Sequence, residues 1–131
     1  MRKHSPNPIP RLKAKVWKVF SEYVRRSAAD RNGMVICFAC GAIKHWKEMN
    51  ASHLFHGKLD SDPLNVQPCC VGCNKYKHGN LGAYTANFIK KYGIDVYDEL
   101  KRRSNIIWKP TREELENLYE FWTAKLEELG K

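Results

Sequence analysis

The sequence predicts a small α+β fold in which flanking helices enclose a short, cysteine-rich β core. Apolar residues recur at helical spacing near both ends of the chain, short β-prone runs lie in the middle, and two Cys-x-x-Cys pairs accompany those runs. A chain of 131 residues fits one domain with a modest hydrophobic core. We therefore expect residues 1–131 to form a single domain.

The N-terminal part is expected to begin as an extended basic arm over residues 1–10, because three prolines interrupt it. Residues 11–33 then form one amphipathic helix that stops at Gly33, since apolar residues recur along it at helical spacing. The opposite face of this helix is basic. Such a face can lie along phosphates, but it is more often simply solvated.

The central segment is expected to carry the β-structure. Residues 34–36 are a β-prone run that leads into the first cysteine pair. Residues 47–54 form the next strand, and a polar loop over residues 56–63 separates it from residues 64–66. The second cysteine pair follows shortly afterwards, so both pairs adjoin short strands.

Residues 93–131 are expected to hold C-terminal helices, preceded by a helix with Asn80 as its cap and Gly93 as its stop. A shorter helix over residues 96–103 follows. Thr111, with Glu114 three residues later, then forms a capping box that starts the last helix. The apolar stripe of that helix predicts that it packs on the first one.

Four of the five cysteines predict one structural zinc site. Zinc prefers four ligands in a tetrahedron, and Cys37 with Cys40, like Cys70 with Cys73, supplies two thiolates from one turn. A pair of redox dithiols is the alternative, but no βαβ pattern accompanies them. A four-thiolate site has no open position, so the ion would support folding and would not activate water. Cys69 is expected to be a small buried residue.

The formal charge of +9 favours a polyanionic partner, most simply nucleic acid, although a merely soluble basic surface is the alternative. The positive excess lies before residue 111, and the last segment is acidic. No apolar run approaches the roughly 20 residues that span a bilayer, and the first residues lead into a Pro-rich polar sequence instead of the apolar run of a signal peptide. We expect an intracellular, cytoplasmic protein with no membrane partner.

Several polar residues lie between and just after the cysteine pairs in a characteristic order. They are Ala51-Ser52-His53, Asn65, and Cys70-x-x-Cys73-Asn74. This pattern resembles HNH-type, ββα-metal endonucleases, in which a His ends one strand, an Asn precedes the second cysteine pair, and a His or Asn directly follows the last Cys. The resemblance implies a zinc-stapled ββα-metal core over residues 34–92, flanked by N- and C-terminal helices.

Residues 34–103 resemble the phage NinG family, also called Rap, still more closely. The shared pattern adds a Gly-Asn pair and a Tyr-bearing helix that ends near Tyr-Gly. Members of that family are recombination nucleases that act on branched DNA. The resemblance therefore implies a phage or prophage origin, a bacterial host cell, and branched DNA such as four-way junctions as the partner.

The resemblance also assigns roles. His53 would be the general base, which its reference pKa of about 6.5 allows. Asn65 would hold the region of His53 in place, and Asn74 would bind a catalytic Mg²⁺ or Mn²⁺. HNH enzymes commonly place an Asp or His ligand directly before the catalytic His, where this chain has Ser52. We expect His56 to replace that ligand, and the further candidates are Asp60, Asp62 and His78.

Three lysines surround these residues and suit contacts with backbone phosphates. They are Lys58, Lys75 and Lys77. Aromatic residues, by contrast, are more often core than base-stacking platforms. We therefore expect core or half-buried packing for Trp46, Tyr84, Phe88 and Trp108.

The sequence thus predicts a metal-dependent DNA endonuclease. A catalytically inactive zinc-ribbon nucleic-acid-binding or adaptor protein is the alternative, which Ser52 favours, and RNA binding through the same basic surface is a third hypothesis. Symmetric action on a junction would suit a homodimer, but no sequence feature establishes one.

Overall fold

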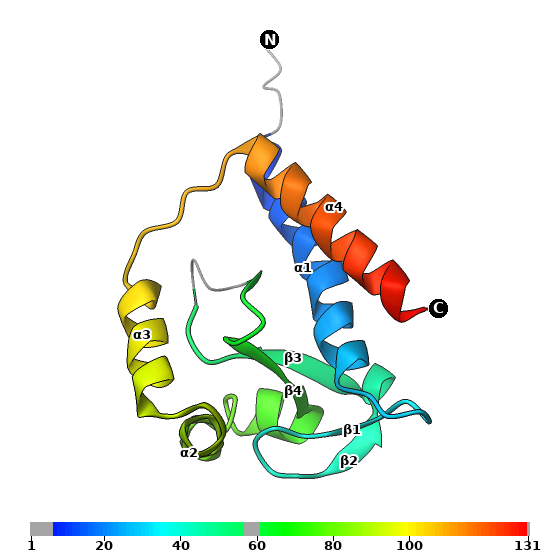
Figure 1. Cartoon of the computed structure of the whole chain (residues 1–131), viewed down its shortest axis with the longest axis vertical. Coiled ribbons are helices and arrows are strands. Elements are labelled where there is room, and N and C mark those ends of the chain that lie inside the picture. Colours follow the sequence, from blue (N-terminus) through cyan, green and yellow to red (C-terminus); the bar gives the residue numbers. More distant parts are fainter. Residues whose placement is uncertain (1–6, 57–60, 131) are drawn as a thin grey trace.

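The computed structural model describes residues 7–56 and 61–130. It has an α+β fold with two small antiparallel sheets among helices (Figure 1). The elements are α1 (Ile9–Ser27), β1 (Met34–Ile36), β2 (Ile43–His45), the 3-10 turn η1 (Trp46–Glu48), β3 (Met49–His53), β4 (Val66–Cys70), the π-helical turn η3 (Gly72–Tyr76), α2 (Leu81–Tyr92), α3 (Ile94–Ser104) and α4 (Arg112–Leu129).

Helix α1 begins and ends earlier than predicted. It starts at Ile9, with Pro8 as the N-cap residue and Pro10 in the first turn, positions where a missing backbone N–H costs no hydrogen bond. It ends at Ser27 rather than at residue 33. The carboxylate of Asp30 accepts hydrogen bonds from the backbone N–H groups of Asn32 and Met34, which favours a turn over a further helical turn. Residues 1–6 of the predicted arm lie outside the described residues.

The strands form two antiparallel hairpins. β1 pairs with β2, and β3 pairs with β4 in a register that sets Met49 opposite Cys70 and His53 opposite Val66. The strand predicted over residues 47–54 starts later, at Met49, because η1 occupies residues 46–48. After the predicted loop, β4 starts at Val66 and runs on to Cys70, so it includes the first cysteine of the second pair.

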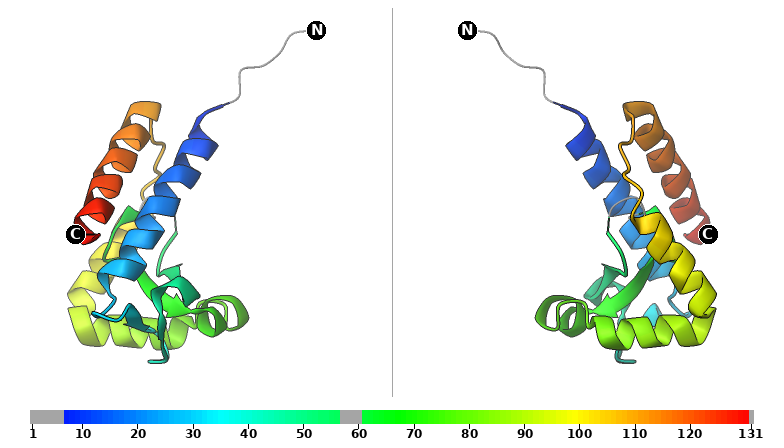
Figure 2. Two further views of the ribbon diagram at one scale, coloured as in Figure 1. Left: turned by 90° about the vertical axis from the view of Figure 1, so that its right-hand side faces the viewer. Right: turned by 90° about the vertical axis from the view of Figure 1, so that its left-hand side faces the viewer.

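The hydrophobic core has two parts, and the β3–β4 hairpin contributes to both. One part joins α1 to α4, where Phe20 and Trp122 pack with ring centroids 4.7 Å apart. Figures 1 and 2 show α1 and α4 side by side, which confirms the predicted packing of the last helix on the first. The other part surrounds the cysteines and includes Tyr84 and Phe88, which are fully buried as predicted.

Helices α2 and α3 follow each other across Gly93, whose φ of 97° is unfavourable for residues with a side chain. The expectation that Asn80 caps α2 with its side chain is wrong. Asn80 occupies the N-cap position, but its side-chain amide donates to the Sγ atom of Cys73 instead, at 3.4 Å. None of the helices within the described residues is long and apolar enough to cross a membrane.

The capping box of α4 yields a stability prediction. The Thr111 hydroxyl accepts from the Glu114 backbone N–H at 3.1 Å, and the Glu114 carboxylate accepts from the Thr111 backbone N–H at 3.1 Å. We expect Thr111→Ala to cost about 1 kcal/mol and to lower the melting temperature by about 3–6 °C. Thr111→Ser, which keeps the hydroxyl, should melt like the wild type in circular dichroism. Equal melting of both variants would contradict this role.

Candidate functional site

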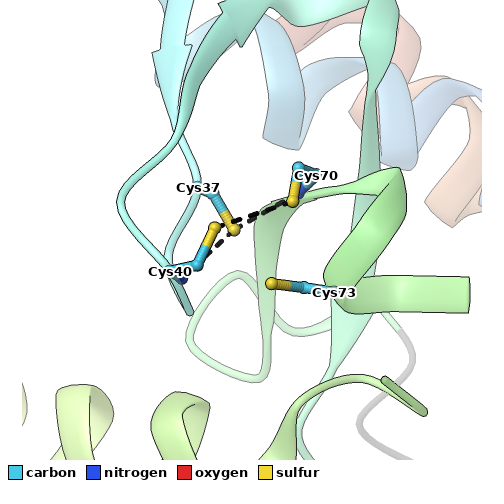
Figure 3. Close-up of side chains that lie close together, drawn as sticks. All are labelled: Cys37, Cys40, Cys70 and Cys73. Carbon is cyan, nitrogen blue, oxygen red and sulfur yellow. Dashed lines mark hydrogen bonds between the residues drawn. The ribbon is translucent and has the colours of Figure 1, made fainter. Parts of the chain in front are cut away.

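The four predicted cysteines meet in space (Figure 3). The Sγ atoms of Cys37, Cys40, Cys70 and Cys73 all lie within 4.8 Å of one another. Those of Cys40 and Cys70 are 3.7 Å apart. Tetrahedral zinc with Zn–S bonds of about 2.3 Å requires S···S separations of about 3.8 Å. The donor set and its spacing therefore fit a structural zinc ion.

Backbone and side-chain N–H groups point at these sulfur atoms, as thiolate ligands require. The Sγ atom of Cys37 accepts from the N–H groups of Cys40 at 3.4 Å and Cys70 at 3.3 Å. Burial alone would raise the pKa of the Cys37 thiol, but these hydrogen bonds outweigh burial and lower the pKa to about 6. At Cys37 the fold therefore stabilises the thiolate that binds metal. At Cys73, by contrast, burial raises the pKa of the thiol to about 12.

Cys69 is outside the cluster, although it precedes Cys70 directly. It is fully buried, as predicted, and burial followed by the nearby Cys37 raises the pKa of its thiol to about 12. Successive residues of a strand point to opposite faces, so Cys69 and Cys70 project differently from β4. Cys69 is thus a neutral packing residue.

His53 ends β3 and is half-buried. Its imidazole stacks on the indole of Trp17, with ring centroids 4.6 Å apart and an interplanar angle of 17°. His56, which is exposed on the segment after β3, lies with its ring centroid 4.9 Å from that of His53. The structure thus brings together His53 and His56, as well as an aromatic residue from α1.

Asn65 fixes the two residues that follow His53. It is fully buried, its side-chain carbonyl accepts from the Phe55 backbone N–H at 2.9 Å, and its amide donates to the Phe55 carbonyl. Its own backbone carbonyl accepts from the Leu54 N–H at 2.8 Å. The Tyr84 hydroxyl, from α2, donates to the carbonyls of Ser52 at 2.8 Å and Asn65 at 3.3 Å. Buried groups paired in this way hold the loop in one conformation.

Asn74 is positioned differently. It is half-buried in η3, which follows β4 from the Cys70 end of the hairpin, whereas His53 lies at the opposite end. Ser52, where related enzymes place an acidic ligand, is buried and 3% exposed. The roles of His53, Asn65 and Asn74 stay predictions.

The other candidates are dispersed. Lys75 and Lys77 are exposed on and after η3, and His78 is exposed with a φ of 50°. Asp62 is engaged by Arg103, whose guanidinium lies 3.4 Å from its carboxylate. The predicted Lys58 and Asp60 lie outside the described residues.

A catalytic metal site is less defined than the cysteine cluster. Within residues 7–56 and 61–130, the four cysteines are the one group of three or more His, Cys, Asp or Glu side chains close enough to share an ion. A hard divalent ion that keeps most of its water ligands needs only one or two protein ligands. His56 and Asn74 are of a suitable type for such a loosely held ion.

The sequence reading missed the contribution of α1 and of the linker before α4. Lys13, Trp17 and Trp108 line a cavity of about 320 Å³ together with His53. Trp108 is half-buried and packs against the core, as predicted, but its indole also lines this cavity. The available signal was the spacing of Lys13 and Trp17, which places both on one face of α1.

The comparisons with known proteins point to one family. The family model described as "Bacteriophage Lambda NinG protein" matches residues 1–131. Proteins named "Protein ninG" are similar over part of the chain: that of Escherichia phage 933W is 28% identical over 83 residues, that of Salmonella phage P22 is 29% identical over 79 residues, and that of Escherichia phage lambda is 26% identical over 83 residues.

These alignments cover 58%, 55% and 58% of this chain, but only 39%, 37% and 39% of the relatives. The chain therefore spans about two-fifths of the length of the curated relatives that it matches. No solved structure matches it significantly.

The positions of the cysteines predict which thiol can be removed without loss of zinc binding. We expect Cys73→Ala to remove zinc, leaving close to none per chain, and to lower the melting temperature strongly, because structural zinc supplies folding free energy. Cys69→Ala should keep one zinc per chain, since Cys69 is not in the cluster. The metal content of the purified variants measures both. Loss of zinc from Cys69→Ala alone would contradict the assignment.

Proposed function

This chain belongs to the family of the bacteriophage lambda NinG protein, and from that premise we propose that it is a metal-dependent DNA endonuclease of the HNH, ββα-metal type. Its substrate would be branched DNA, such as a four-way junction formed in phage or prophage recombination. The excess of basic residues supports a DNA partner.

The observation that carries the proposal is the way Asn65 holds the loop after His53. Its amide pairs with both backbone groups of Phe55, so His53 leaves β3 in a fixed direction beside a cavity. A general base must keep its orientation toward the proton that it removes. The arrangement suits a catalytic imidazole better than a surface histidine.

In the proposed reaction, a neutral His53 imidazole accepts a proton from water, and the resulting hydroxide attacks the phosphorus atom. The P–O bond to the leaving group breaks, and the departing oxygen takes a proton from solvent. The stacked indole of Trp17 fixes the plane of the imidazole. When bound, a divalent ion such as Mg²⁺ or Mn²⁺ supplies positive charge at the departing oxygen.

The resemblance assigns His56 and Asn74 to that ion; His56 adjoins His53, whereas Asn74 lies in η3 at the other end of the hairpin. The ring contact between His53 and His56 supports His56 as the replacement for the acidic ligand absent at Ser52. The exposed Lys75 and Lys77 would bind backbone phosphates without regard to sequence.

One observation favours a second function. The residue directly before His53 is the buried Ser52, which provides no carboxylate or imidazole for a catalytic ion. A zinc-dependent DNA-binding or adaptor protein requires no such ligand. It would bind branched DNA and cut nothing with any divalent ion.

The test compares cleavage of labelled four-way junction and linear duplex DNA in Mg²⁺ or Mn²⁺. We expect the wild type to cut the junction preferentially, and His53→Ala to lower the rate by at least about 100-fold, because a general base contributes about 10²–10⁴-fold. DNA binding and zinc content should be unchanged.

His45→Ala is the matched control, since His45 belongs to the β1–β2 hairpin, away from His53. Normal cutting by His53→Ala would sink the proposal. Absence of cutting by the wild type, with binding retained, would favour the adaptor function. Equal cutting of duplex and junction would refute the branched substrate.

Asn65 gives a separate prediction about positioning. Asn65→Ala leaves two backbone groups of Phe55 without their partners, which costs about 1–3 kcal/mol for each buried group. Asn65→Asp keeps the acceptor for the Phe55 N–H and replaces the donor with a carboxyl oxygen that faces the Phe55 carbonyl. In Asn65→Asp we expect folded protein whose cleavage rate falls while its affinity for DNA persists. A rate equal to that of the wild type would argue against positioning by Asn65.

A further inference from the structure

The cavity beside His53 is built from parts of the chain that are far apart in sequence. It has a volume of about 320 Å³ and lies between α1, the end of β3, Ser61, the segment that joins α3 to α4, and the start of α4. Small-molecule pockets range from about 300 to 1,000 Å³, so one small planar group fits. Its walls are chiefly apolar and aromatic, and the polar groups on it are those of Lys13, His53 and Ser61.

The two indoles of the cavity have different surroundings. Trp17 already presents its ring to the imidazole of His53. Trp108 lies in the linker between α3 and α4. It is half-buried and its indole lines the cavity, whereas the preceding residue, Ile107, is 82% exposed. The Nζ atom of Lys13 lies 5.6 Å from the centre of the Trp108 ring. A cation therefore adjoins an aromatic surface within reach of the proposed catalytic base.

This combination matches a nucleotide. Every nucleobase can stack on an aromatic ring, whatever the sequence, and an ammonium group pairs with the adjoining phosphate. A base inside a stacked duplex is not available to such a cavity, because the base must first leave the stack. Leaving the stack costs least where the base is already unpaired, as at a branch point.

We propose that this cavity receives the base of an unpaired nucleotide next to the phosphate that His53 attacks, with Trp108 as the stacking surface and Lys13 as the phosphate contact. The proposal rests on the proposed nuclease function and specifies its substrate. Selectivity for branched DNA then arises from the need for an unstacked base rather than from recognition of sequence.

The experiment uses DNA that carries the fluorescent base 2-aminopurine at a single unpaired position, in a duplex with a one-nucleotide bulge. Binding is measured without added divalent ions, so the readout does not depend on cleavage. We expect the wild type to quench the fluorescence, because the base stacks on Trp108. The same DNA with an abasic site at that position should bind about 5- to 100-fold more weakly, the fold-change that matches the loss of one stacked base.

Trp108→Ala should abolish the quenching and should bind the bulged and the abasic DNA equally. Ile107→Ala is its control, because Ile107 is exposed in the same linker and does not line the cavity.

Lys13→Gln should weaken DNA binding and reduce the salt dependence of that binding. Lys15→Gln is the matched control, because Lys15 lies over the Tyr119 ring, away from the cavity. If Trp108→Ala does not fold, Trp108→Phe should retain the stacking and Lys13→Gln still tests the phosphate contact.

The outcomes separate the two proposals. Quenching that depends on Trp108, in a protein that cuts no DNA, would support the cavity and contradict the nuclease. Junction cleavage by a protein whose Trp108→Ala variant binds and cuts like the wild type would overturn the cavity. Unchanged 2-aminopurine fluorescence on binding would overturn it as well.

Discussion

The antiparallel pairing of β3 with β4 is the constraint on which the rest of the structure depends. Its register fixes Met49 opposite Cys70 and His53 opposite Val66. One end of the hairpin therefore belongs to the cysteine cluster and the other to the candidate base. A slip by one residue would turn each side chain to the other face, which would move Cys70 out of the cluster.

The cysteine cluster explains how so short a hairpin stays in register. A two-stranded hairpin is marginally stable alone, and the strands here are five residues each. Cys37 and Cys40 precede β3 in the chain, Cys70 and Cys73 lie at and after the end of β4, and all four Sγ atoms lie close together. A zinc ion bound there would hold β4 against the turn after β1. Tyr84 adds a second tie, because its buried hydroxyl links α2 to the carbonyls of Ser52 and Asn65.

The candidate site is a composite of distant segments. His53 comes from the end of β3, Trp17 and Lys13 come from α1, and Trp108 comes from the linker before α4. The packing of α1 on α4 holds these parts at one place (Figure 2). The flanking helices thus contribute directly to the cavity beside His53, and the contact between Phe20 and Trp122 belongs to the packing that joins them.

The sequence by itself determined the features that depend on neighbours in the chain. The cysteine spacing predicted each half of the cysteine cluster, and the Thr111–Glu114 pair predicted the start of α4, because each of these pairs is formed within one turn. Local sequence patterns predicted the ends of α1 less accurately. They predicted a side-chain cap at Asn80, but its side-chain amide donates to the Sγ atom of Cys73. Only the tertiary structure decided that Trp108 and His53 line one cavity, because that cavity requires α1 and α4, which lie near opposite ends of the chain, to pack together.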